Sequence, residues 1–241
     1  MAGRTPCLVI SGLKGFYKYL FLENLMTVDP TEMLESPKIG RKLPNTLSVE
    51  EIDLLINSID LSKPEGERNK AILETLYGCG LRVTELVNVR ISNIFFNEGF
   101  LKVTGKGNKE RVVPIGISVQ KALLKYLTKF RPKQAHPNFT NIFLNRDGMP
   151  LTPNRVQTII EIYSKKAGIK GIRASPHTFR HTFAVSYLRN GGDMFTLQRI
   201  LGHESLDMVR NYVNVTQYDL QRAHLLHSPA DNIRFHLQDK R

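Results

Sequence analysis

Helix start and stop signals dominate the second half of this chain. Residues 152–168 and 175–191 each begin with a hydroxyl residue followed by proline and end with glycine. Proline suits the first turn of a helix and glycine the position just past its end, so each segment predicts one complete helix. With the apolar spacing elsewhere, we expect helices at residues 119–130, 153–167, 176–190, 194–201 and 206–214.

Three short apolar runs in the first half predict strands instead. The runs at 94–96, 100–103 and 111–115 are separated by glycine-containing turns at 97–99 and 105–108. Short runs joined by such turns are typical of antiparallel hairpins. The predicted fold class is mainly α with a small three-stranded antiparallel β-sheet, an α+β fold.

Helical signals also precede these strands. Ser48, with Glu51 three residues later, predicts a capping box, and a second helix is expected over 68–78. Gly80 then breaks the chain, so Arg82 is predicted to begin a third helix.

A change in composition suggests a domain boundary. The segment SPKIGRKLPN, residues 36–45, has two prolines and three basic residues without apolar periodicity, as in a linker. Before it, a helix is expected over 12–25, followed by a turn at Asp29-Pro30 and a short helix from Thr31 to Leu34. The expected organisation is a helical remnant at 1–35, a linker at 36–45, a main domain at 46–227 and a tail at 228–241.

The strong positive charge favours a polyanionic partner. The chain has 34 Lys+Arg against 22 Asp+Glu, a net charge of +12. Charge alone does not separate DNA from RNA, or either from a solvated basic surface or an anionic membrane face. No run of about 18 apolar residues and no signal-peptide pattern is found, so we expect a cytoplasmic protein without a membrane partner. Cys7 and Cys79 fit no metal or redox spacing.

Two segments carry side chains suited to phosphate chemistry. His177, Arg180 and His181 stand at i, i+3 and i+4, so they can share one helical face. The permanent charge of Arg180 disfavours a metal between the histidines, whereas arginine and histidine near a helix start suit a phosphate. Further on, His203 lies in a glycine-containing turn and Tyr212 nine residues later. Each feature alone is also compatible with ordinary helix packing.

Taken together, four motifs resemble the catalytic motifs of the tyrosine recombinase family, and they are most similar to those of its Xer-type and integrase-type members. They are GCGLRVTEL, TGKGNKERVVPI, HTFRHTFA and LGHES followed by Tyr212. The resemblance covers residues 46 to about 215. Residues 12–35 also resemble the last part of the family's core-binding domain. The implied fold is the recombinase catalytic domain preceded by a helical remnant.

The resemblance implies Tyr212 as a nucleophile that forms a covalent 3′-phosphotyrosyl ester. A phenol has a pKa of about 10, so only about one in a thousand is ionised at pH 7, and roughly 4 kcal/mol of help is needed. Arg82 and Arg180 would stabilise the charge on the phosphate. Lys106 would protonate the leaving 5′-oxygen, while His177 would act as base.

His203 would hydrogen-bond the phosphate in the same assignment, and Glu85 would orient Arg82. No metal, nucleotide or other cofactor is expected. Three further residues of the predicted hairpin are candidates for contacts with DNA phosphates or, equally, solvated strand residues: Lys102, Lys109 and Arg111.

The expected partner is double-stranded DNA, bound by a homotetramer on two sites; the oligomeric state without DNA stays open, with a monomer as one alternative. The resemblance implies that a carboxy-terminal helix at 217–227 docks on a neighbouring protomer; packing on its own domain is the alternative. A non-catalytic DNA-binding regulator derived from a recombinase remains open, because residues 194–214 also fit a helix-turn-helix reader. A type IB topoisomerase remains open too. The sequence does not separate chromosome-dimer resolution from the integration or excision of a mobile element.

Overall fold

The computed structural model describes residues 4–35 and 45–202. The chain divides into two compact units, Met1–Leu43 and Pro44–Arg241. Each is described by itself. No helix within the described ranges combines the length and apolar character needed to cross a membrane.

The first unit contains one long helix, α1 (Arg4–Leu22), which begins eight residues earlier than the sequence indicated. A turn follows, in which the Asp29 carboxylate accepts hydrogen bonds from the Thr31 backbone N–H (2.8 Å) and hydroxyl (2.6 Å). The short helix predicted from Thr31 to Leu34 is wrong. A single turn forms there, closed by the Leu34 N–H on the Thr31 carbonyl, because so short a segment does not offset the cost of helix nucleation.

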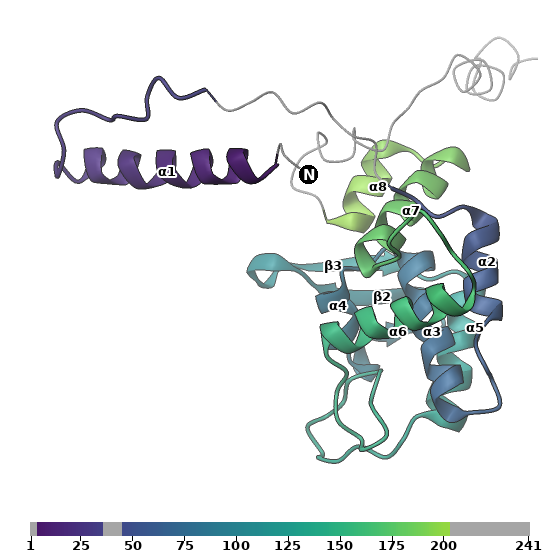
Figure 1. Cartoon of the computed structure of the whole chain (residues 1–241). Helices are drawn as coiled ribbons and strands as arrows, with labels where there is room; N and C mark the ends of the chain where they lie inside the picture. Colours follow the sequence, from purple (N-terminus) through teal and green to yellow (C-terminus); the bar gives the residue numbers. More distant parts are fainter. Residues whose placement is uncertain (1–3, 36–44, 203–241) are drawn as a thin grey trace, which may run out of the picture. The chain divides into compact units, whose positions relative to one another are not determined.

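The second unit combines seven α-helices with a small sheet within residues 45–202 (Figure 1). Its elements are α2 (Val49–Asn57), α3 (Pro64–Cys79), α4 (Val83–Asn88), η1 (Ile91–Asn93), β1 (Ile94–Phe95), β2 (Phe100–Thr104), η2 (Lys106–Asn108), β3 (Glu110–Pro114), α5 (Ile117–Lys125), η3 (Tyr126–Phe130), α6 (Pro153–Lys166), α7 (Pro176–Arg189) and α8 (Met194–Leu201). The predicted α+β class and the three antiparallel strands are confirmed. The helix predicted at 206–214 lies outside the described residues.

Helix α3 runs through the centre of this unit. It packs against α2, α4, α5, α6, α7 and η3, and five of its side chains are fully buried: Ala71, Ile72, Leu73, Leu76 and Cys79. It begins at Pro64, four residues before the predicted start, because proline supplies the first helical position there. It ends at Cys79, one residue beyond the predicted end at residue 78, and Gly80 caps it in the left-handed conformation (φ 59°).

Side-chain caps begin four other helices; those of Ser48, Thr152 and Ser175 were predicted, and that of Asp193 was not. The Ser48 and Glu51 capping box is present, with bonds of 3.1 and 2.8 Å. The side chains of Thr152, Ser175 and Asp193 each accept a backbone N–H three residues on, at α6, α7 and α8. Helix α8 packs against both β3 and α7 (Figure 1), which brings its carboxyl end to the sheet.

The two faces of β3 differ sharply. Arg111 and Val113 share the face that meets the core, whereas Glu110 and Val112 point outward. On the outer face Lys102 of β2 forms an ion pair with Glu110 (2.6 Å). The inward position of Arg111 matters for the site.

Candidate active site

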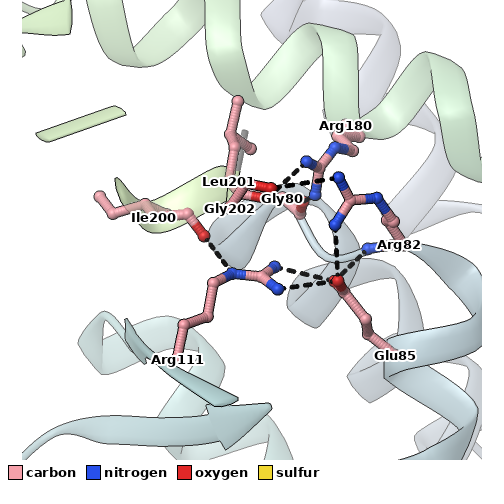
Figure 2. Close-up of polar contacts among 8 residues, drawn as sticks. All are labelled: Gly80, Arg82, Glu85, Arg111, Arg180, Ile200, Leu201 and Gly202. Atoms are coloured by element: carbon pink, nitrogen blue, oxygen red, sulfur yellow. Dashed lines mark hydrogen bonds and ion pairs between the residues drawn. The ribbon is translucent and has the colours of Figure 1, made fainter. Parts of the chain in front are cut away.

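Three arginine side chains converge on the carboxyl end of α8 (Figure 2). Arg111 Nε donates to the Ile200 carbonyl (2.7 Å), Arg180 Nη2 to the Leu201 carbonyl (2.7 Å) and Arg82 Nη2 to the Gly202 carbonyl (3.4 Å). The last carbonyls of a helix lack partners within it and form the negative end of its dipole, so guanidinium groups stabilise them. Residues far apart in sequence thus meet at one helix end.

The Glu85 carboxylate joins two of these arginines. Its Oε1 accepts from Arg82 Nη1 (2.9 Å) and Arg111 Nη1 (2.8 Å), and its Oε2 from Arg111 Nη2 (2.8 Å) and the Arg82 backbone N–H (2.8 Å). Burial alone would raise the pKa of Glu85, but the hydrogen bonds from Arg111 and Arg82 outweigh it and the pKa is lowered. Glu85 is therefore an ionised acceptor that holds the Arg82 guanidinium, the orienting contact that the sequence suggested.

Arg180 is almost completely buried, with 5% of its surface exposed. Besides the α8 carbonyl, its Nη1 donates to the Gly80 carbonyl (2.7 Å). Gly80 lies two residues before Arg82, so Arg180 links the chain just before Arg82 to the end of α8. The guanidinium groups of Arg82 and Arg180 therefore lie at neighbouring carbonyls of one helix end.

Lys106 begins the turn η2 between β2 and β3, as predicted. Gly107 (φ 71°) and Asn108 (φ 57°) give the turn its left-handed backbone. The side chain of Lys106 is outside the described set. Gly105, just before it, lies against the ion pair: a Cβ there would be 3.5 Å from Arg111 Nη1 and 3.6 Å from Glu85 Oε1.

His177 lies in the first turn of α7, three residues before Arg180. Its Nε2 is 2.7 Å from Nε2 of His181, so one of these two nitrogens donates and the other accepts. Burial, and then the charge of Arg180, lower the pKa of His177. Burial together with His177 and Arg180 lowers that of His181 to about 4. Both imidazoles are therefore predominantly neutral at pH 7.

The structure thus brings Arg82 and Arg180 together, sets Lys106 in its turn and leaves His177 on α7. His203 and Tyr212 lie outside the described residues. Of the proposed phosphate contacts, Lys102 is paired with Glu110, Lys109 is exposed and Arg111 points inward.

Sequence reasoning did not recognise the inward role of Arg111. The signal was present, because the alternation of β3 puts Arg111 on the same face as Val113, which is fully buried.

Within residues 4–35 and 45–202 no three His, Cys, Asp or Glu side chains gather as metal ligands. Cys79 is buried in the core, which raises its pKa to about 12 and leaves it a thiol at neutral pH.

Comparison with known proteins identifies the class. The model of the phage integrase family matches residues 45–218. Tyrosine recombinase XerD of Listeria monocytogenes serotype 4b is 37% identical over 222 residues, which cover 91% of this chain and 74% of the relative. XerD of Pseudomonas putida is 37% identical over 227 residues, 94% of this chain and 76% of the relative. The crystal structure of XerA recombinase is 32% identical, with a TM-score of 0.65 over 92% of this chain and 75% of that one.

This chain therefore belongs to the phage integrase family of tyrosine recombinases. The three relatives named above are all Xer recombinases.

Proposed function

We propose that this tyrosine recombinase performs site-specific recombination by cutting and rejoining DNA strands through a covalent 3′-phosphotyrosine at Tyr212. The observation that carries the proposal is the convergence of Arg82 and Arg180 on one end of α8, directly before the segment with His203 and Tyr212. Two adjacent guanidinium groups suit the non-bridging oxygens of a phosphodiester, whose charge increases in the transition state.

The covalent step is a displacement at phosphorus. Tyr212 Oη forms a bond to the scissile phosphorus while the bond from phosphorus to the 5′-oxygen breaks. The phenolic proton passes to His177, whose lowered pKa keeps it neutral and able to accept a proton at pH 7. Lys106 gives a proton to the departing 5′-oxygen, and His203 hydrogen-bonds the phosphate.

Rejoining reverses these transfers. The 5′-hydroxyl of another strand attacks the phosphotyrosyl ester, and the phenol leaves with its proton restored. The ester conserves the energy of the phosphodiester, so the cycle requires neither a metal ion nor nucleotide hydrolysis.

DNA is the proposed partner, supported by the charge of +12 and by the solved structures. A XerH recombinase bound to difH in a post-cleavage complex has a TM-score of 0.69 at 24% identity, over 90% of this chain and 64% of that one. A lambda integrase dimer bound to a core site has a TM-score of 0.66 at 21% identity, over 83% of this chain and 72% of that one. Lys102 and Lys109 are proposed phosphate contacts on the hairpin.

We also propose that residues 46–227 are the catalytic domain, that 1–35 belong to a core-binding domain, and that a tetramer on two DNA sites is the active assembly. In this proposal the helix at 217–227 of each protomer docks on its neighbour.

The test is capture of the covalent adduct. Nicked suicide duplexes would be made from DNA bordering the gene and from sequences selected by binding to the protein. The wild type should give a protein–DNA adduct that survives SDS, and Tyr212→Phe should give none. Tyr187→Phe, which removes a phenol oxygen from α7, should keep the adduct.

Two results would replace the proposal. Wild type that binds these duplexes without ever forming an adduct would be a DNA-binding regulator. Adducts on any sequence, with relaxation of supercoiled plasmids that lack a site, would indicate a topoisomerase.

A further inference from the structure

We propose that Arg111 is a positioning residue for strand cleavage, and that it acts through Glu85 and the end of α8 without contacting DNA phosphate. This inference rests on the proposed recombinase function. It concerns a residue of the hairpin whose sequence setting, among basic neighbours, suggested a phosphate contact.

The donors of Arg111 point into the protein (Figure 2). Its Nη1 and Nη2 meet the two oxygens of Glu85 side by side, each at 2.8 Å, and its Nε reaches the Ile200 carbonyl at 2.7 Å. Only 13% of the Arg111 side chain and 2% of the Glu85 side chain are exposed. A two-pronged pair of this kind fixes direction as well as distance.

Three segments that carry proposed catalytic residues meet at this pair. Glu85 Oε1 is shared with Arg82, so a displaced carboxylate displaces the Arg82 guanidinium as well. The hairpin turn packs on the pair through Gly105, next to Lys106 in sequence.

The third segment is the end of α8. Besides the bond to Ile200, the side chain of Arg111 lies so close to Gly202 that a Cβ there would be 3.0 Å from Arg111 Cδ. Gly202 immediately precedes His203.

Loss of Arg111 would leave Glu85 with two of its four hydrogen-bond donors. A carboxylate that is 98% buried cannot replace them with bulk water and must shift or draw Arg82 further inward. Either movement changes where Arg82 holds the phosphate, and a displacement of about 1 Å at a reacting centre can cost about 100-fold in rate.

Lys109 supplies the contrast, because it is exposed in the same hairpin. Arg111 is only 13% exposed, and its Nε, Nη1 and Nη2 donate to Ile200 and Glu85, so it presents little surface to the DNA backbone. DNA affinity and its salt dependence should therefore depend on Lys109 and not on Arg111.

The experiment measures two quantities on the suicide duplex: DNA affinity across a salt series, and the single-turnover rate of adduct formation with all DNA bound. The variants are Arg111→Ala, Arg111→Lys and Lys109→Ala. Arg131→Ala is the matched structural control, because Arg131 also donates to backbone carbonyls, those of Phe139, Asn141 and Ile142. Circular dichroism gives the folded fraction of each.

Both Arg111 variants should lose about 100-fold in the rate on bound DNA, while the affinity changes less than about threefold. Lysine should not restore the rate, because a single ammonium cannot bond both Glu85 oxygens and the Ile200 carbonyl together. Lys109→Ala should weaken binding and reduce the salt slope by about 0.9. Arg131→Ala should keep the rate per folded molecule.

The inference is overturned if Arg111→Ala weakens binding with a reduced salt slope and Arg111→Lys restores it, because that is the behaviour of a phosphate contact. It is also overturned if both variants cleave at the wild-type rate per folded molecule. Failure of the proposed function has a different signature, since the wild type itself would then form no adduct.

Discussion

Replacement of Gly80 by alanine should destabilise the domain more than its backbone conformation alone requires. Gly80 has φ 59°, where an L residue costs about 1–2 kcal/mol. In addition, the new Cβ would lie 2.3 Å from Phe183 Cδ1 and 3.0 Å from Leu201 Cδ2. The Phe183 ring cannot easily move away, because it packs against the cluster of Ala184, Leu197 and Leu201. Overpacking of this kind adds about 1–3 kcal/mol.

Gly168→Ala is the matched control. Gly168 also has a left-handed backbone (φ 71°) just after a helix, but no atom lies within 4 Å of its added Cβ. The difference between the two variants therefore isolates the clash with Phe183 and Leu201. For a domain of this size each kcal/mol lowers Tm by about 2–4 °C, so Gly80→Ala should melt about 2–12 °C below Gly168→Ala.

Thermal unfolding followed by circular dichroism checks this, with both variants compared at one pH and salt concentration. The Gly80 carbonyl also accepts from Arg180, so adduct formation per folded molecule should fall in Gly80→Ala only. Equal melting temperatures for the two variants would refute the reasoning, because the close approach of Phe183 would then cost nothing.

Two further predictions concern a half-buried histidine and a buried asparagine. The folded-state pKa of His181, about 4, is below its ordinary 6.5, so the unfolded chain takes up the proton first and stability should be lost as pH falls from about 6.5 to about 4. The urea midpoints at pH 7 and pH 5 should therefore differ less in His181→Asn than in wild type. In the control His136→Asn, whose histidine is exposed, the two midpoints should differ as much as in wild type. A wild-type difference between the midpoints of His181→Asn would contradict this prediction. The second prediction is that Asn69→Asp stabilises the domain by about 1 kcal/mol. The Arg68 side chain, which is 95% buried, donates from Nε and Nη2 to Asn69 Oδ1 at 3.1 and 2.9 Å, and the substitution would make this acceptor a charged one. The Tyr163 hydroxyl accepts a hydrogen bond from Asn69 Nδ2 in the wild type and can donate one to the new carboxylate. A lower urea midpoint for Asn69→Asp would contradict the prediction, because burial of the carboxylate would then cost more free energy than its pairing with Arg68 contributes.

Local signals in the sequence predicted most of the secondary structure, because their physical causes are local. The hydroxyl caps of α6 and α7 and the glycine after α3 each act within about four residues of the helix end that they define. Failures arose where a local signal was weak: the turn at Thr31 to Leu34 is too short to be a helix, and α3 extends back to Pro64.

The arrangement of the site could not be derived in the same way. Arg82 meets Gly202 across 120 residues and Arg111 meets Ile200 across 89, and no periodicity reports such contacts. The chemistry of the motifs named Arg82 and Arg180, but only the packing of α8 on β3 shows that Arg111 joins the same helix end.

Part of the positive charge of the chain lies inside the domain, where it is not available to DNA. Arg68 is 5% exposed, and Arg111 is held by Glu85. These two guanidinium groups bond backbone carbonyls and side-chain oxygens inside the domain. They contribute to the count of +12 but present little charge to a ligand at the surface. A salt-dependence measurement should therefore count exposed residues such as Lys109, and a basic residue in a recombinase hairpin should be assigned to DNA only after its strand face is known.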